Sequence, residues 1–137
     1  MAKYEFTSRG PKIVWLPFWV LVSSRPRQWL KNLAVFAALV FEGEFFNPDR
    51  FWPTVYGFII FSIATSGTYL INDVIDAKKD LAHPFKARRP IASGRLHPFA
   101  GLVIGVALLA LAISLSNALS TFFMLAIIAY VLLQILY

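Results

Sequence analysis

Apolar runs alternate with short polar or charged segments along almost the whole chain. Four of these runs are close to the length of about 20 residues that an α-helix needs to cross the hydrocarbon core of a membrane. We therefore expect an all-α fold, a multi-pass transmembrane bundle of about four membrane helices. The predicted helices run from Pro26 to about Phe46, from Phe51 to about Asp80, from His97 to Ser116 and from Ala118 to Tyr137, with a tight turn at Asn117.

Prolines and small residues refine this picture. Pro26 suits the first turn of a helix, where its missing N–H leaves no bond unmade, and Pro84 ends the second helix soon after Asp80. Gly101 and Gly105 stand four residues apart, a spacing typical of close contact between membrane helices. The two histidines precede prolines and are expected to be loop residues without a metal.

The first 25 residues form a separate segment. Residues 1–12 are polar and basic, which indicates a cytoplasmic tail. Residues 13–22 are apolar, but the run is too short to span a membrane and Pro17 interrupts it. No small-residue cleavage site follows, so a signal peptide is disfavoured, and the tryptophans indicate a helix lying in the membrane interface.

Composition and charge agree with a membrane protein. Hydrophobic residues make up 58% of the 137 residues, and the mean hydropathy is +0.66. The net charge of +6 is concentrated in residues 1–25 and 77–97, whereas the link 42–50 is acidic. The positive-inside rule therefore places the N-terminus and the 77–97 loop on the cytoplasmic face of the cell membrane. Nucleic-acid binding is disfavoured, because the bases lie at membrane ends and the aromatics within apolar runs.

The most informative polar residues follow the second long apolar run. At about 100° per residue, a continuous helix with Asn72 at 0° places Asp73 near about 100°, Asp76 near about 40° and Asp80 near about 80°. Carboxylates on one stripe repel unless a cation lies between them. Oxygen ligands suit Mg²⁺, which is commonly held by one or two carboxylates and substrate phosphates. The alternative is a solvated acidic helix end partnered by Lys78 and Lys79.

Basic residues near these carboxylates are candidate phosphate ligands. In the first helix Arg27 and Lys31 share a face with two amide side chains, which indicates a lined cavity, although both cations could instead reach lipid phosphates. In the loop after Asp80, Lys86, Arg88 and Arg89 are close enough in sequence to contact the same anion. Lys78 and Arg95 are assigned only to membrane topology.

These motifs together resemble a known family. The stretch Asn72-Asp73-x-x-Asp76-x-x-x-Asp80 followed by Arg89-Pro90-Ile91 resembles the first aspartate-rich motif of the UbiA superfamily of intramembrane prenyltransferases. The Gln-Trp-x-Lys-Asn sequence at 28–32 and His83-Pro84-x-Lys86 most resemble its decaprenyl-phosphate phosphoribosyltransferase branch. The resemblance covers roughly residues 20–137.

The resemblance implies a function and a site. The complete enzyme would transfer phosphoribose from phosphoribosyl pyrophosphate, the phosphorylated sugar substrate, to a polyprenyl phosphate. Catalytic, Mg²⁺-binding carboxylates would hold the leaving pyrophosphate, and the neighbouring polar residues would bind phosphate oxygens. The implied metal-binding set is Asp73, Asp76 and Asp80, and the implied phosphate-binding set is Arg27, Lys31, Asn72, Lys86, Arg88 and Arg89.

Three alternatives remain open. The same metal site serves prenyl transfer from a polyprenyl diphosphate to an aromatic or other hydrophobic acceptor. Members of the family are about twice as long, with about nine helices and a second aspartate motif, so residues 1–137 are expected to form a single incomplete domain. Such a piece could also act as a non-catalytic membrane subunit, or belong to a transporter whose acidic stripe binds cations.

Overall fold

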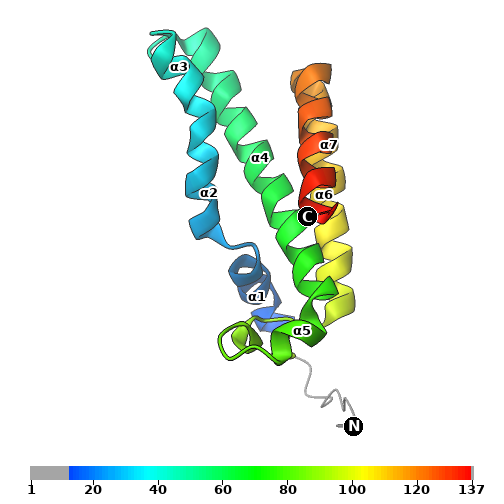
Figure 1. Cartoon of the computed structure of the whole chain (residues 1–137). Helices are drawn as coiled ribbons and strands as arrows, with labels where there is room; N and C mark the ends of the chain where they lie inside the picture. Colours follow the sequence, from blue (N-terminus) through cyan, green and yellow to red (C-terminus); the bar gives the residue numbers. More distant parts are fainter. Residues whose placement is uncertain (1–12, 137) are drawn as a thin grey trace.

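A computed structural model describes residues 13–136, which contain helices and turns and no strand (Figure 1). The predicted all-α fold is confirmed. The prediction of a cytoplasmic tail at residues 1–12 lies outside the described residues. In chain order the helices are the 3₁₀-helix η1 Ile13–Trp15, α1 Leu16–Ser23, α2 Pro26–Asn32, η2 Leu33–Phe36, α3 Ala37–Phe41, α4 Pro48–Ile75, α5 Ala77–Leu81, η3 Lys86–Arg88, α6 Pro98–Leu119 and α7 Thr121–Leu136.

Helix α4 is the central element of the bundle. Helices α1, α2, α6 and α7 all contact it, and its 28 residues extend for about 42 Å at 1.5 Å per residue. It begins at Pro48, three residues before the predicted start. Asn47 caps it by accepting a 3.1 Å hydrogen bond from the Asp49 N–H, and the proline and acid that follow favour a helix start.

The predicted first membrane helix is shorter than expected and is not uniform. It begins at Pro26, as predicted, but its α-helical parts are separated by the 3₁₀-helix η2 and it ends at Phe41 instead of about Phe46. Gly43 stops it with a left-handed φ of 72°. The chain then turns at the far end of the molecule and enters α4 (Figure 1).

The turn between the last two helices was predicted at the wrong residue. Asn117 lies inside α6 with an exposed side chain, and the chain turns at Ser120, whose backbone is extended. The Ser120 N–H still bonds the Ser116 carbonyl, while the Ser120 carbonyl accepts from the Met124 N–H at 3.0 Å. Ser120 thus ends α6 and precedes α7 at the N-cap position, where serine is a favoured residue. Asn117 is accommodated in the last turn of α6.

Glycines allow α4 and α6 to pack closely, as their spacing predicts. A Cβ atom added at Gly67 would lie 2.9 Å from the Gly105 carbonyl oxygen, and one added at Gly105 would lie 2.9 Å from Ile71 Cγ1. Gly101 is packed in the same way against Ile91 of the loop that precedes α6, because a Cβ atom added at Gly101 would lie 2.8 Å from Ile91 Cδ1. The backbones therefore approach more closely than larger residues would permit.

Two described helices, α4 and α6, are long and apolar enough to cross a membrane. Helix α7 is apolar but has 16 residues in the described part of the chain. Large apolar side chains of α6 such as Val103 and Val106 are about half exposed. Trp15 of η1 and Phe18 of α1 are exposed as well, as expected of a segment in the membrane interface.

Candidate functional site

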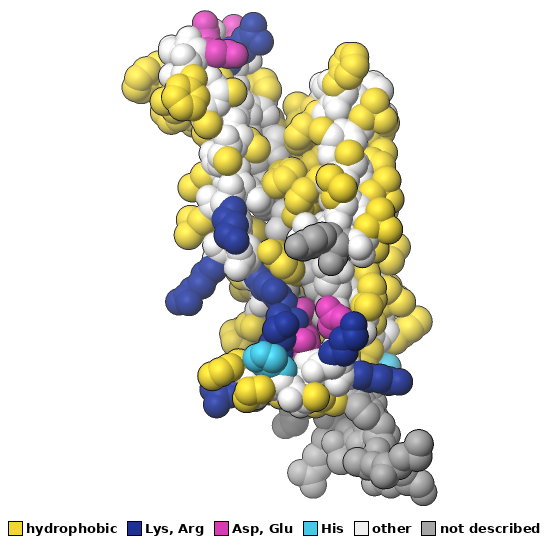
Figure 2. Space-filling view, viewed as in Figure 1, with side chains coloured by type: hydrophobic (Ala, Val, Ile, Leu, Met, Phe, Trp, Pro, Cys, Tyr) yellow, Lys and Arg dark blue, Asp and Glu magenta, His cyan; other side chains and the backbone are white. Residues whose placement is uncertain are grey.

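Arg25, the base that precedes α2, and the basic loop after α5 meet at one end of the bundle. The residues that precede α2 and the loop that follows α5 lie at this end, with carboxylates between them (Figure 2). The acidic link at 42–50 lies at the opposite end (Figure 1). The basic and acidic segments of the sequence therefore lie at opposite ends of the folded molecule.

Asp73 is the centre of an ion-pair cluster. Its side chain is 2% exposed, and its Oδ1 atom accepts hydrogen bonds from Arg25 Nη2 at 2.5 Å and from Arg89 Nη1 at 3.2 Å. The same Arg89 nitrogen lies 2.6 Å from Oδ2 of Asp80, which is also buried. One guanidinium nitrogen thus bridges two carboxylates that are seven residues apart.

Asp76 is not brought into this cluster. Helix α4 ends at Ile75 and α5 begins at Ala77, so the continuous helix assumed for the stripe of carboxylates is interrupted at Asp76. Its side chain is 43% exposed and lies 3.6 Å from Lys79 Nζ. Among residues 13–136 no group of three acidic, histidine or cysteine side chains is close enough to hold a metal ion.

The cluster is chemically suited to a hard cation with an incomplete set of protein ligands. Asp73 and Asp80 supply carboxylate oxygens around one positively charged atom. Mg²⁺ is commonly held by one or two carboxylates, with substrate phosphates and water completing its octahedron. Two carboxylates therefore fit this mode of binding, and the assignment of Asp76 as a ligand stays a prediction.

Arg25 is a member of the cluster that sequence reasoning did not assign to the site. It precedes Pro26 and has a left-handed backbone, with φ at 51°. Its guanidinium also stacks over the Tyr69 ring, 4.5 Å from the centroid. The sequence did contain an indication of this role. Arg25 directly precedes the proline that starts a helix, at the same predicted membrane end as the aspartates.

The other predicted phosphate ligands do not pair with the described members of the cluster. Arg27, Lys86 and Arg88 are exposed, and within the described chain they form no ion pair with a carboxylate. Asn72 is half-buried and donates from Nδ2 to the Gln134 carbonyl oxygen at 3.4 Å. These side chains are therefore available for an external anion, but their binding role stays a prediction.

The two histidines shape the loop ends. Nδ1 of His83 accepts from the backbone N–H groups of Phe85 and Lys86 at 3.3 and 3.4 Å. His97 caps α6, where its Nδ1 accepts from the Phe99 N–H at 3.2 Å. The prediction that both histidines are loop residues is confirmed. The structure adds that His97 caps α6.

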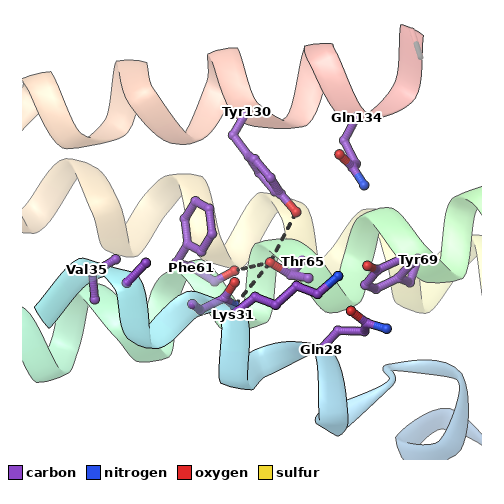
Figure 3. Close-up of a pocket in the computed structure, with 10 residues that line it drawn as sticks. Gln28, Lys31, Val35, Phe61, Thr65, Tyr69, Tyr130 and Gln134 are labelled. Atoms are coloured by element: carbon purple, nitrogen blue, oxygen red, sulfur yellow. Dashed lines mark hydrogen bonds between the residues drawn. The ribbon is translucent and has the colours of Figure 1, made fainter. Parts of the chain in front are cut away.

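A polar pocket of about 610 Å³ opens between α2, α4 and α7, next to the cluster (Figure 3). Asn32 borders it and donates to Ser62 and Thr65 of α4, at 3.2 and 3.3 Å. The Lys31 side chain extends along the opening (Figure 3). The cavity predicted beside the polar face of the first helix is thus present. Its lining residues are Gln28, Lys31, Asn32, Ala34, Val35, Phe61, Thr65, Tyr69, Tyr130 and Gln134.

A second pocket, of about 450 Å³, lies on the other side of α2 and is almost entirely apolar. Residues from α1, α2, α4 and α6 line it. Trp29 forms one wall and is held there by a 3.1 Å hydrogen bond from Nε1 to Ser66 Oγ. The first helix therefore separates a polar from an apolar cavity, in agreement with its predicted polar and aromatic faces.

Comparison with known proteins decides the family. Residues 32–137 match the UbiA prenyltransferase family. The chain belongs to this family. The match covers α4 and α5, which carry Asp73 and Asp80, and all described residues that follow them. The resemblance seen in the aspartate and Gln-Trp motifs is confirmed, and the UbiA chain is a membrane protein.

Three relatives that carry the name decaprenyl-phosphate phosphoribosyltransferase are similar to parts of the UbiA chain. The protein of Corynebacterium glutamicum is 40% identical over 94 residues, which are 67% of this chain and 28% of that protein. The protein of Mycolicibacterium smegmatis is 47% identical over 74 residues, 51% of this chain and 23% of the relative. The Mycobacterium tuberculosis protein is 34% identical over 122 residues, 86% of this chain and 40% of the relative. The chain therefore spans less than half the length of these relatives.

Proposed function

We propose that this UbiA chain contributes the pyrophosphate-binding part of a transferase that moves phosphoribose from phosphoribosyl pyrophosphate to a polyprenyl phosphate. The observation that carries the proposal is the buried Asp73 with its two arginines at the end of a membrane helix. Ionisable side chains are costly to bury at the end of a membrane helix, which supports a functional role for this cluster. The names of the three relatives support the choice of donor and acceptor.

The residues of the cluster suit a leaving pyrophosphate. In the proposed reaction the bond from ribose C1 to pyrophosphate breaks, the electron pair leaves with pyrophosphate, and C1 bonds to an oxygen of the lipid phosphate. Arginine forks bind phosphate oxygens in pairs, so Arg25 and Arg89 are placed to bind the donor. Arg27, Asn72, Lys86 and Arg88 add further contacts to the pyrophosphate oxygens, and Lys31 binds a phosphate group at the polar pocket that it lines.

Mg²⁺ is part of the proposal. Asp73 and Asp80 would hold it, and Asp76 is the remaining candidate ligand. Such an ion would neutralise the charge that builds on pyrophosphate as the bond to the sugar breaks. Arg89 then has to move away from at least one of the two carboxylates that it bridges, which frees its guanidinium for the anion.

The proposed location is the cell membrane, with the cluster facing the cytoplasm. The described basic residues around the cluster lie at the end opposite to the acidic link (Figure 2), and cytoplasmic loops carry the excess of Lys and Arg. A water-soluble sugar phosphate would reach the cluster from that side.

Prenyl transfer from a polyprenyl diphosphate is the second candidate. The description of the family as prenyltransferases favours it. The same carboxylates and arginines would bind the diphosphate, so the two candidates differ in the group attached to it.

Binding of phosphoribosyl pyrophosphate and of geranyl diphosphate to the purified chain in detergent, with and without Mg²⁺, separates these functions. We expect Mg²⁺-dependent binding with preference for the ribose ligand. Preference for geranyl diphosphate would favour prenyl transfer, and Mg²⁺ binding without either ligand would favour a cation-binding membrane subunit.

Two matched variants test the residues. Asp73→Asn is expected to weaken Mg²⁺-dependent pyrophosphate binding far more than Lys78→Ala, because Lys78 is exposed and pairs with no carboxylate among the described residues. Asp80→Asn should act like Asp73→Asn. Equal effects of the aspartate and lysine variants would contradict the site assignment.

A further inference from the structure

The polar pocket between α2 and α7 is lined by a cation that has no neutralising partner in the described part of the chain. Lys31 lines it, and within residues 13–136 no carboxylate lies in ion-pair distance of this lysine. The lining contains no acidic side chain. Lys31 is the sixth residue of α2, about 8 Å along the helix from Pro26 at 1.5 Å per residue. Lys31 is exposed at the opening, so it offers its positive charge to an anion that enters the pocket.

The pocket also contains an acceptor with no donor among the described residues. Gln28 Oε1 is buried, and nothing in residues 13–136 donates a hydrogen bond to it. An unsatisfied buried acceptor is unfavourable by about 1–3 kcal/mol, so a ligand that donates a hydrogen bond would be bound preferentially. The chain has two glutamines, Gln28 and Gln134, and both line this pocket. Their amides supply donors and acceptors on opposite sides (Figure 3).

Hydroxyl groups of the pocket are oriented by their neighbours. Thr65 Oγ1 donates to the Phe61 carbonyl oxygen at 2.8 Å and accepts from Asn32 Nδ2. The Tyr130 hydroxyl lies 3.3 Å from Thr65 Oγ1 and points into the pocket (Figure 3). Because the Thr65 proton is already used, Tyr130 donates to Thr65 and keeps its oxygen lone pairs for a ligand hydroxyl.

The pocket and the ion-pair cluster are adjacent. Tyr69 lines the pocket and carries the Arg25 guanidinium on its ring at 4.5 Å. On the α7 side, Asn72 is bonded to the backbone of Gln134. A single ligand can therefore place one end at Arg25 and Asp73 and the other end in the pocket, whose volume of about 610 Å³ is sufficient for a small sugar phosphate.

We propose that this pocket binds the hydroxylated, phosphate-bearing pentose of the donor and thereby selects it over a prenyl chain. The inference rests on the proposed pyrophosphate site and adds the residues that recognise the group attached to it. Lys31 pairs with the sugar phosphate, and Gln28, Tyr130 and Gln134 bond to the sugar hydroxyls. A hydrocarbon chain would leave all these groups unpaired, and sites built for hydrogen bonding reject ligands that lack the partner.

Separate binding of the two halves of the donor tests the proposal. Ribose 5-phosphate and inorganic pyrophosphate, the latter with Mg²⁺, are titrated against the full chain in lipid nanodiscs. Lys31→Met is expected to lower the affinity for ribose 5-phosphate by about tenfold or more, the effect of losing a charged hydrogen bond. Pyrophosphate affinity should stay unchanged. Lys78→Met, an exposed lysine outside the pocket, is the matched control and should change neither affinity.

Tyr130→Phe keeps the test informative if the lysine variant folds poorly. It removes one oxygen and retains the ring that packs on Phe61 at 4.6 Å between centroids. It should also weaken ribose 5-phosphate binding, whereas Tyr56→Phe, on an exposed part of α4, should not. Unchanged ribose 5-phosphate affinity in both pocket variants would overturn the proposal, as would its failure to bind the unchanged chain.

Two further outcomes separate this inference from the proposed function. If Asp73→Asn abolishes pyrophosphate binding while the pocket variants have no effect, the proposed function stands and the pentose assignment fails. If a polyprenyl phosphate displaces ribose 5-phosphate and its own binding depends on Lys31, the pocket holds the acceptor's phosphate and the pentose assignment is overturned.

Discussion

Arg25 Nη2 lies 2.5 Å from Oδ1 of the buried Asp73. The ion pair joins the residue before α2 to the last turns of α4, 48 positions later in the chain. It holds the interfacial helix α1 and the first membrane segment against the end of the helix that carries the carboxylates.

Replacing Arg25 by methionine should destabilise the protein. Asp73 keeps Arg89 as a partner, so the expected loss in free energy of unfolding is about 1–3 kcal/mol, below that for a buried charge with no partner left. Unfolding with sodium dodecyl sulfate in mixed micelles measures it. Arg27→Met, two residues away and exposed, is the control, and an equal loss in both variants would contradict a structural role for the ion pair.

Arg89→Gln should loosen the loop that follows α5. Arg89 is the described base that ties this loop to both Asp73 and Asp80. Without it, hydrogen exchange of residues 82–97 should become faster, because local opening no longer breaks two ion pairs. The neighbouring Arg88 is exposed and forms no ion pair in the described structure, so Arg88→Gln should leave exchange unchanged. Identical exchange in both variants would show that other contacts hold the loop.

A methyl group at Gly67 should separate α4 from α6. The added Cβ would lie 2.9 Å from the Gly105 carbonyl oxygen, a backbone atom that cannot move away alone. We expect Gly67→Ala to destabilise the protein by about 1–3 kcal/mol. At Gly57, in the same helix, the nearest atom to an added Cβ is Phe123 Cζ at 3.7 Å. There alanine should be neutral or stabilising by up to about 1 kcal/mol, since it favours helix more than glycine does.

Single cysteines should report the orientation in the membrane. The chain has none, so each introduced thiol is unique. Ser93→Cys lies in the basic loop and Glu42→Cys in the acidic link, and both positions are exposed. A membrane-impermeant maleimide should label position 42 in intact spheroplasts and position 93 only in inverted vesicles. The reverse pattern would place the carboxylates outside the cytoplasm.

Local chemistry was enough to predict most of the framework. Pro26 starts a helix, and Gly105 marks the contact of α4 with α6. Asp73 has positive charge beside it, supplied by arginines where Mg²⁺ was predicted, and the metal stays a prediction. Each depends on a property of the residue itself, such as a fixed φ, a missing side chain or an unneutralised carboxylate. These properties do not depend on which other elements the residue packs against, so they can be predicted from the sequence.

The details that were missed depend on tertiary contacts. Which base reaches Asp73 is decided by the packing of α1 and α2 on α4, and no pattern near Asp73 names Arg25. Whether Tyr130 and Gln134 line the polar pocket depends on the rotation of α7 against α4 and α6. The break at Asp76 and the turn at Ser120 are choices between nearby residues of similar propensity, so sequence alone could not locate them.

The left-handed backbone at Arg25 places opposite requirements on one residue. Glycine adopts a φ of 51° more easily, by roughly 1–2 kcal/mol, than a residue with a side chain, yet only a cationic side chain can bond to Asp73. A library of variants at this position would therefore be ranked differently by a selection for folded protein and by one for anion binding. A substitution at residue 25 chosen only to raise the stability of the protein would therefore weaken its binding of an anion.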